Sequence, residues 1–350
     1  MTSFKIAVYP GDGIGLEVTE QACLVLGAIE ASSALSFKLH AFPWGIEYWR
    51  KNGSLVPADF LAQLTEFDAI FLGAVGWPDE MPDHLTLEPL VKIRQAFDQY
   101  ACVRPARLFR GVPSVLAGKG PADIDLAVVR ENSEGEYISV GGRFKIGTPE
   151  EHAIQTGIHS RRGVERVLRY GFELARTRRS RLTMATKSNA LRYAYVMWDE
   201  ILEELKPEYP DVVADRQHCD ALAMNFVRSP ESFDVVVASN LFGDLLTDLG
   251  GVIGGGLGLA PSANINPERN FPSMFEPVHG SAPDIAGQGI CNPIAAILSV
   301  AMMLHHLGQH EQAERVERAV ENALLDGHKT RDLGGKLTTV EMGAAVAAYL

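Results

Sequence analysis

Short apolar runs alternate along the chain with segments of helical period. Residues 4–10 form an apolar run typical of a β-strand, a glycine-rich turn follows at residues 11–15, and residues 16–31 place apolar side chains at helical spacing. The same order recurs at four further runs, residues 67–76, 123–132, 181–189 and 233–240. Strands that alternate with helices predict an α/β fold.

The unusual polar side chains of the chain follow the ends of these expected strands, which is where α/β folds gather their sites. Residues 250–273 are rich in Gly, Pro and Asn and break the pattern, so they predict a crossing or hinge segment between two lobes. Two lobes also fit the length, because 350 residues exceed the size at which one core keeps growing.

Composition narrows the class of protein. The first residues lack a basic segment followed by an apolar one, and the longest apolar stretch, residues 293–304, is too short to span a bilayer. We therefore expect neither secretion nor a membrane partner. The cysteines stand far apart without a C-x-x-C pair, which favours buried thiols in a reducing, cytoplasmic compartment. They are Cys23, Cys102, Cys219 and Cys291.

Charge argues against nucleic acid as a partner. The formal net charge is −12, whereas phosphate binding needs a basic surplus. The one basic run, residues 159–181, alternates arginines with apolar residues at helical spacing and predicts a solvated helix face. We interpret His218 as structural and the histidines of residues 304–310 as an exposed helix end.

Two acids stand four residues apart in SNLFGDLLTDLGG, residues 239–251. In a helix Asp244 and Asp248 share a face. They either belong to a solvated face opposite a buried stripe of leucines or hold a cation between them. The leucines of this expected stripe are Leu245, Leu246 and Leu249. Asp220 supplies a third carboxylate. Oxygen ligands of this kind suit Mg²⁺ or Mn²⁺.

Three arginines have apolar neighbours at or near the ends of expected elements: Arg94, Arg104 and Arg130. A lone arginine usually lies on the surface. Three that converged would offer forked donors matched to the carboxylates of a small dicarboxylate.

Two further residues could transfer protons. Tyr137 follows Arg130 in RENSEGEY and becomes a proton donor if a neighbour tunes its pKa; otherwise it is a loop tyrosine. Lys187 stands between an apolar strand and a helix, where a partly desolvated ammonium could act as a base; the alternative is a surface lysine.

Glycine-rich segments point to a nucleotide only in part. Residues 11–15 read G-x-G-x-G rather than G-x-G-x-x-G, and a tight turn explains their glycines as well. The chain has neither a P-loop nor a G-x-S-x-G motif. The loop in residues 275–293 could wrap a nucleotide, and Asp284 would accept ribose hydroxyls but repel a 2′-phosphate.

Together these motifs resemble the β-decarboxylating dehydrogenases, the family of isopropylmalate, isocitrate, homoisocitrate and tartrate/D-malate dehydrogenases. The motifs GDGIG, VRPAR, VVREN, ATKSN, SNLFGDLLTDLGG and FEPVHGSAPDIAG occur in the family's order. The resemblance implies an isopropylmalate dehydrogenase-like doubly wound α/β fold that is not a Rossmann fold. Residues 1–99 and 255–350 would form a large lobe with the nucleotide loop. Residues 100–254 would form a small lobe with the metal carboxylates and the dimer contact.

The resemblance also implies roles. Arg94, Arg104 and Arg130 would bind the substrate carboxylates. Asp244 and Asp248 would hold Mg²⁺ or Mn²⁺, while Asp220 and Lys187 would reach into the site of the second subunit of a homodimer. Lys187 would remove the hydroxyl proton as hydride passes to NAD⁺, the metal would stabilise the enolate left by decarboxylation, and Tyr137 would protonate it.

Further residues are assigned by the same resemblance. Leu90 would border the substrate. Asp284 followed by Ile285 resembles the NAD-using members and predicts NAD⁺ over NADP⁺. The residues expected at the cofactor are Ile14, Asn189, Glu276, His279, Gly280, Ser281, Ala282, Asp284, Ile285 and Asn292.

The substrate prediction is D-malate or tartrate ahead of 3-isopropylmalate. RENSEGEY, with Glu134 and Glu136, and several longer segments resemble the tartrate/D-malate branch. Leu87, Cys102 and the segment CDALAMNFV depart from it, so 3-isopropylmalate dehydrogenase remains the alternative. A non-catalytic dicarboxylate-binding protein would need the arginines but not the metal carboxylates, Lys187 or a nucleotide loop.

Overall fold

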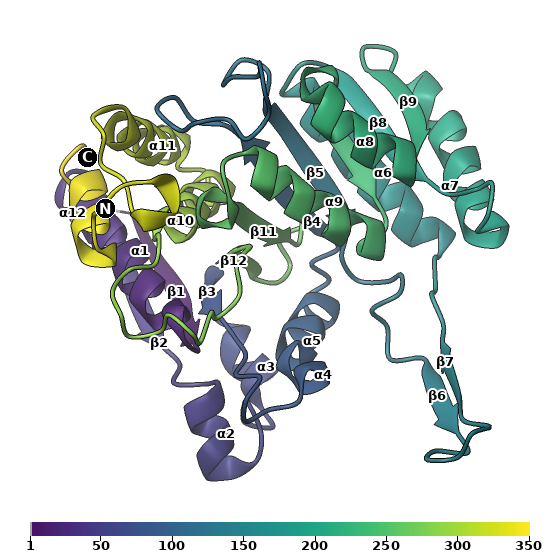
Figure 1. The fold of residues 1–350 in the computed structure, drawn as a ribbon, viewed down its shortest axis with the longest axis horizontal. Coiled ribbons are helices and arrows are strands. Elements are labelled where there is room, and N and C mark those ends of the chain that lie inside the picture. Colours follow the sequence, from purple (N-terminus) through teal and green to yellow (C-terminus); the bar gives the residue numbers. More distant parts are fainter. Residues whose placement is uncertain (1) are drawn as a thin grey trace.

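The computed structural model describes residues 2–350 and is built on one sheet of ten strands, with helices on both faces (Figure 1). The strand order is β2-β1-β3-β12-β11-β4-β5-β10-β8-β9. Its strands are β1 (Thr2–Gly11), β2 (Leu35–Ala41), β3 (Ala69–Ala74), β4 (Ala101–Arg107), β5 (Asp125–Glu131), β8 (Arg181–Thr186), β9 (Val213–His218), β10 (Val235–Ala238), β11 (Pro261–Ile265) and β12 (Ser273–Pro277).

The helices follow the alternation expected from the sequence. They are α1 (Ile14–Ala31), α2 (Ile46–Asn52), α3 (Phe60–Leu64), α4 (Asp83–Thr86), α5 (Glu88–Ala96), α6 (Arg161–Arg176), α7 (Arg192–Leu205), α8 (Cys219–Arg228), α9 (Asn240–Ile253), α10 (Ile294–His306), α11 (His310–Leu325) and α12 (Thr339–Ala347). The predicted α/β fold is confirmed.

The middle of the sheet is antiparallel and its two flanks are parallel. β11 pairs antiparallel with both β12 and β4, and β4 pairs antiparallel with β5. On one side of this centre β1, β3 and β12 run parallel to one another, and on the other side β5, β10 and β8 do so. This mixed centre distinguishes the sheet from the parallel Rossmann arrangement.

The longest apolar stretch of the sequence forms a core helix. α10 has ten buried residues and contacts α1, α11, β11 and β12. Because it is apolar almost all round, it must be covered on every side. Within residues 2–350, no helix combines the length and hydrophobicity needed to cross a membrane.

A second, two-stranded sheet stands apart from the main body. β6 (Gly141–Phe144) and β7 (His152–Gln155) pair antiparallel, and all eight of their residues are exposed. The hairpin projects away from the helices that surround the main sheet (Figure 1). An isolated hairpin of this length is only marginally stable in water, so a covering partner would stabilise it.

The basic run forms the amphipathic helix α6, as expected. Arg161, Arg169 and Arg176 pair on the surface with Glu204, Glu208 and Asp211. These exposed pairs make a solvated face, while the opposite side of the helix packs on the sheet through Val164, Val167 and Leu168.

Three sequence expectations need correction. Residues 250–273 do lead across the molecule, but they contain β11, a fully buried strand at the centre of the sheet. Its proline and small residues hide the apolar pattern that marks the other strands. Leu245 is 62% exposed and does not join the buried stripe of α9. His306 is half-buried rather than exposed, because its ring lies near Phe275.

Candidate active site

Three arginines converge on one face of the sheet. Arg104 on β4 and Arg130 on β5 point to the same side, since alternate residues of a strand share a face. Arg94 reaches the same region from the last turn of α5. All three are at most 8% exposed. Buried guanidinium groups need acceptors, and most of those here come from α9, β11 and β12.

Asp244 on α9 lies at the centre of this cluster. It pairs with Arg130, accepts a hydrogen bond from Arg104 Nη1 at 3.3 Å, and accepts another from the Tyr137 hydroxyl at 2.8 Å. Although burial alone would raise it, the charges of Arg130 and Arg104 hold the pKa of Asp244 below its ordinary value. Asp244 is therefore a carboxylate at neutral pH.

Asp248 stands one turn further along α9. Burial and the charge of Asp244 raise its pKa, so the two carboxylates lie close enough to repel each other. Two anionic oxygen donors on one helix face fit a hard divalent cation, which would relieve this repulsion. The donor set therefore suits Mg²⁺ or Mn²⁺ better than a softer metal.

Side chains that the sequence reasoning missed hold the arginines in place. Asn240 Oδ1 accepts from Arg130 Nε at 3.0 Å and Nη2 at 2.7 Å. Arg104 donates to Thr247 at 2.8 Å and to Ser262 at 3.3 Å. Asn240 begins α9 two residues after β10, a position that marks it as a site candidate, whereas Ser262 lies in β11, where the sequence predicts a hinge.

Arg94 is bound by Glu276, which the sequence analysis had assigned to the cofactor. Arg94 Nη2 lies 2.8 Å from Glu276 Oε1, and Asn264 donates to the same oxygen at 2.8 Å. The Nε of Arg94 is buried and has no acceptor among the described residues. An anion bound beside it would satisfy this donor.

The neighbourhood of Arg94 includes Val91 more directly than Leu90. Val91, Arg94 and Tyr137 line one small cavity between α5 and the loop after β5. Leu90 is 4% exposed and belongs to a buried cluster with Ile93.

Lys187 and Asp220 lie apart from this cluster. They pair with each other at 2.8 Å, with the carboxylate of Asp220 largely exposed. No hydrogen bond or ion pair found in residues 2–350 joins them to Asp244 or Asp248, and no three His, Cys, Asp or Glu residues there form a metal-binding group. One chain thus brings together two of the three expected metal carboxylates.

The loop of residues 278–293, called the nucleotide loop below, packs on the GDGIG turn. The amide of Ile14 donates to the carbonyl of Ser281 at 2.8 Å. A Cβ on Gly13, whose φ is +56°, would lie 2.0 Å from that same carbonyl, so the close contact requires glycine. Glu17 fixes the far side of the loop through the amides of Gly287 at 2.7 Å and Gly289 at 3.0 Å.

Several residues expected at the cofactor lie on this loop with free polar groups. Asp284 is exposed and its carboxylate has no partner among the described residues, while the Nε2 atom of His279 is buried without one. These groups fit a ligand that carries hydroxyls and a nitrogenous ring. Asn292 instead accepts a hydrogen bond from the amide of Ile294, the first residue of α10, and donates one to Asp332. Asn189 is exposed after β8, on the loop of Lys187.

Comparison with known proteins identifies the class. Residues 5–346 match the family described as isocitrate/isopropylmalate dehydrogenase, and the chain belongs to this family. The resemblance inferred from the motifs and the predicted isopropylmalate dehydrogenase-like fold are therefore confirmed.

Individual relatives cover the full chain. D-malate dehydrogenase (decarboxylating) of Escherichia coli (strain K12) is 51% identical, over 100% of this chain and 99% of the relative. Tartrate dehydrogenase/decarboxylase of Pseudomonas putida is also 51% identical, over 99% and 98%. The crystal structure of isocitrate dehydrogenase from Methylococcus capsulatus has a TM-score of 0.87 and 36% identity over 99% of both chains.

Proposed function

We propose that this protein oxidises a 2-hydroxy dicarboxylate, D-malate or tartrate, with NAD⁺ and a divalent cation, and that β-decarboxylation follows. The observation that carries the proposal is the convergence of three buried arginines on Asp244, within a chain 51% identical to a decarboxylating D-malate dehydrogenase. The buried Nε of Arg94 has no acceptor among the described residues, and guanidinium groups offer the forked donors that suit carboxylates, so the cluster can bind a dicarboxylate.

The substrate and the cation would be held by residues of this cluster. Arg94, Arg104 and Arg130 would bind the two carboxylates of the substrate, and Asp244 and Asp248 would hold the cation. When bound, Mg²⁺ or Mn²⁺ supplies a Lewis acid and NAD⁺ supplies the acceptor for hydride.

Two side chains move the protons. Lys187 takes the proton of the hydroxyl on carbon 2, and Tyr137 returns a proton to carbon 3 after carbon dioxide has left. Burial and the hydrogen bond to Asp244 raise the pKa of Tyr137, so its phenol is protonated at neutral pH and able to donate.

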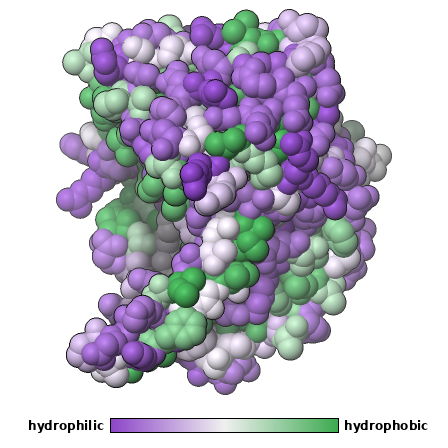
Figure 2. Space-filling view, turned by 90° about the vertical axis from the view of Figure 1, so that its right-hand side faces the viewer, coloured by the Kyte–Doolittle hydropathy of each residue, from purple (hydrophilic) through white to green (hydrophobic). Residues whose placement is uncertain are grey.

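We propose that Lys187 and Asp220 complete the site of a second copy of this chain, so that the active unit is a homodimer. Their separation from Asp244 within one chain supports this. So do exposed apolar side chains on two neighbouring helices, Met224 on α8 and Leu245 on α9. Figure 2 shows one side of the molecule, where groups of hydrophobic side chains lie among hydrophilic ones in its lower half.

Ile14 at the start of α1 and the nucleotide loop would together hold NAD⁺. The loop residues are His279, Gly280, Ser281, Ala282, Asp284 and Ile285. Asp284 accepts both ribose hydroxyls and repels a 2′-phosphate, which favours NAD⁺ over NADP⁺. Glu276 would position Arg94 and would not contact NAD⁺ itself. Asn189 lies on the loop of Lys187 and would reach the site of the second copy with it.

We further propose two lobes, residues 1–99 with 255–350 and residues 100–254. The strand order supports this, because each group contributes one contiguous half of the ten-stranded sheet. The four cysteines are free, which supports a reducing compartment such as the cytoplasm.

The experiment is steady-state kinetics of the purified protein with NAD⁺ and Mn²⁺ on D-malate, the tartrate stereoisomers, 3-isopropylmalate and isocitrate. We expect the highest kcat/KM with D-malate or a tartrate. A highest value with 3-isopropylmalate would overturn the substrate, and no reduction of NAD⁺ with any diacid would overturn the enzyme.

Asp244→Asn tests the cation site directly. It removes one anionic ligand and should abolish metal-dependent turnover while the protein remains folded. The matched control is Asp215→Asn on β9, an exposed acid without an ion pair among the described residues. Equal activity and equal Mn²⁺ dependence in Asp244→Asn and wild type would refute the assignment.

A further inference from the structure

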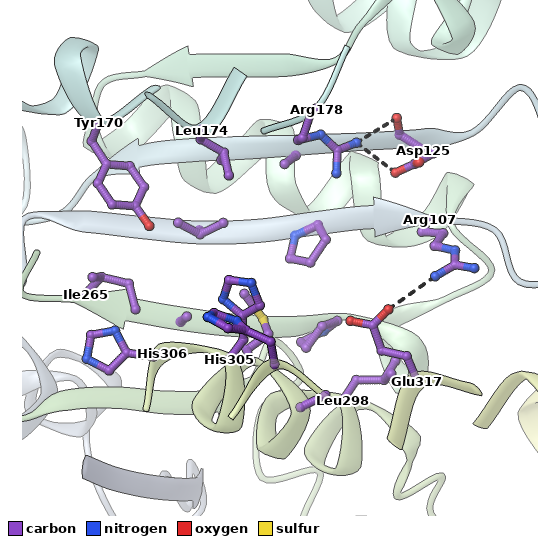
Figure 3. Close-up of a pocket in the computed structure, with 18 of the residues that line it drawn as sticks. Arg107, Asp125, Tyr170, Leu174, Arg178, Ile265, Leu298, His305, His306 and Glu317 are labelled. Carbon is purple, nitrogen blue, oxygen red and sulfur yellow. Dashed lines mark hydrogen bonds and ion pairs between the residues drawn. The ribbon is translucent and has the colours of Figure 1, made fainter. Parts of the chain in front are cut away.

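A second cavity lies on the face of the sheet opposite the arginine cluster. It has a volume of about 530 Å³, and its floor is the central strands β11, β4 and β5 (Figure 3). On β4, Arg104 faces the cluster and Val103 faces the cavity. On β11, Ser262 faces the cluster and Ala263 faces the cavity. The floor is mostly small or apolar because short side chains occupy these alternate positions.

Helices from both halves of the sheet wall this cavity. α6 contributes Tyr170 and Leu174 on one side, and α10 contributes Leu298 and Met302 on the other. The two helix layers do not meet over the central strands, which leaves the floor open to a ligand. The volume and the apolar lining are in the range of small-molecule sites.

The two ends of the cavity differ in charge. At one end the arginines are already paired: Arg178 with Asp125 at 2.8 Å, and Arg107 with Glu317 at 3.4 Å (Figure 3). These pairs leave little net charge for a ligand to meet.

At the other end the charged guanidinium of Arg269 lies near His306. Burial, together with the nearby charges of Arg269 and His305, lowers the pKa of His306 to about 4, so its imidazole is neutral at pH 7. Arg269 makes no ion pair among residues 2–350. The adjacent Glu268 is engaged by the Tyr100 hydroxyl at 3.0 Å, so it is not directed to Arg269.

The remaining charged groups near this end do not cancel the surplus. His310 lies beside His305, with ring centroids 4.4 Å apart. Glu314 faces His305 but pairs with Arg318 at 3.1 Å. The Tyr170 hydroxyl has no hydrogen-bond partner among the described side chains and points into the cavity (Figure 3).

We propose that this cavity is a second ligand site, which binds an organic anion with an apolar body, an acyl or aryl carboxylate. The carboxylate lies at the end formed by Arg269 and His306, where a guanidinium can bind it with two hydrogen bonds. The chain or ring lies along the apolar floor and contacts both helix layers.

The probe is octanoate, an eight-carbon carboxylate, titrated into the purified full-length protein by calorimetry, so the test is independent of the proposed catalytic activity. We expect saturable binding with one site per chain. Octylammonium has the same apolar body and the opposite charge, and it should bind at least about tenfold more weakly.

Two variants locate the site. Arg269→Asn removes the unpaired charge at an exposed position whose φ is +57°, a conformation that asparagine tolerates, so the fold should be kept. Ala263→Leu fills the floor. Each should weaken octanoate binding about tenfold or more. The matched control, Arg181→Gln, removes an exposed unpaired arginine at the start of β8 and should leave binding unchanged.

Three results would overturn the proposal: no saturable binding of octanoate at millimolar concentration, equal binding of octylammonium, or binding that neither Arg269→Asn nor Ala263→Leu weakens. The last result would place octanoate elsewhere on the protein. If Ala263→Leu proves unstable, Arg269→Asn alone decides, because it leaves the buried floor intact.

Discussion

Asn240→Ala tests how much the orientation of Arg130 by Asn240 contributes to activity. One oxygen of Asn240 accepts two hydrogen bonds from a guanidinium that is 3% exposed, at 3.0 and 2.7 Å. A hydrogen bond to a charged group contributes ~1.5–3 kcal/mol, and its loss leaves buried donors unmet. At about tenfold for each 1.4 kcal/mol, kcat/KM for the diacid should fall roughly 10- to 150-fold.

Most of this loss should appear in KM. Arg130 keeps its pair with Asp244 but loses the support that fixes its plane, so both substrate and transition state are bound less well. The same loss should lower Tm by roughly 2–4 °C, given the unfolding entropy of a chain of this length.

The assay is steady-state kinetics with NAD⁺ and Mn²⁺ beside thermal unfolding. Asn52→Ala is the matched control: it removes an exposed amide that donates to the Tyr48 carbonyl on α2, remote from the cluster. It should leave kcat/KM unchanged. The reasoning fails if Asn240→Ala keeps kcat/KM within about twofold of wild type while Tm falls.

Three further changes follow from the same contacts. Glu17→Gln replaces one of the two accepting oxygens by an NH2 donor, so at least one of the two hydrogen bonds that fix the nucleotide loop is lost. KM for NAD⁺ should then rise about three- to tenfold with kcat unchanged; an equal KM would contradict this. Gly243→Ala places a Cβ 2.6 Å from Arg130 and should cost about 1–3 kcal/mol by denaturant unfolding, whereas an unchanged midpoint would show that α9 moves freely. His306 has a pKa of about 4 when folded and 6.5 as its ordinary value, so the folded state should lose up to about 3 kcal/mol as pH falls from 6.5 to 4. His306→Gln should lack this loss, and equal pH slopes in urea titrations would refute it.

The parts of the fold that the sequence could predict are those encoded by local period. The run that became β10 and the helix that became α9 follow each other with clear strand and helix spacing. The sequence does not predict β11, because this strand consists of Pro261 and mostly small or polar residues and has no apolar pattern. It is nevertheless fully buried, because β12 and β4 pair with its two edges. Burial there comes from tertiary contacts.

The same distinction applies to the site. Arg104 and Arg130 stand out as charged residues within apolar strands, a signal that a single sequence carries. The residues that bind these arginines give no such signal in the sequence. Arg94, for example, pairs with Glu276, which is 182 residues away, and no local spacing predicts such a pair. The fold brings the polar groups that orient a charged side chain close to it from distant parts of the sequence. They can therefore be identified only in the folded structure.

The Lys187–Asp220 pair lies apart from Asp244 within one chain, and under the proposed shared site this separation would make activity depend on protein concentration. If each site needs groups from two copies, specific activity per chain is set by the association constant and falls on dilution, as the share of paired chains falls. Dilution would then lower the activity reversibly without any bound inhibitor. Reconcentration would restore the lost turnover without any change in the fold of either chain.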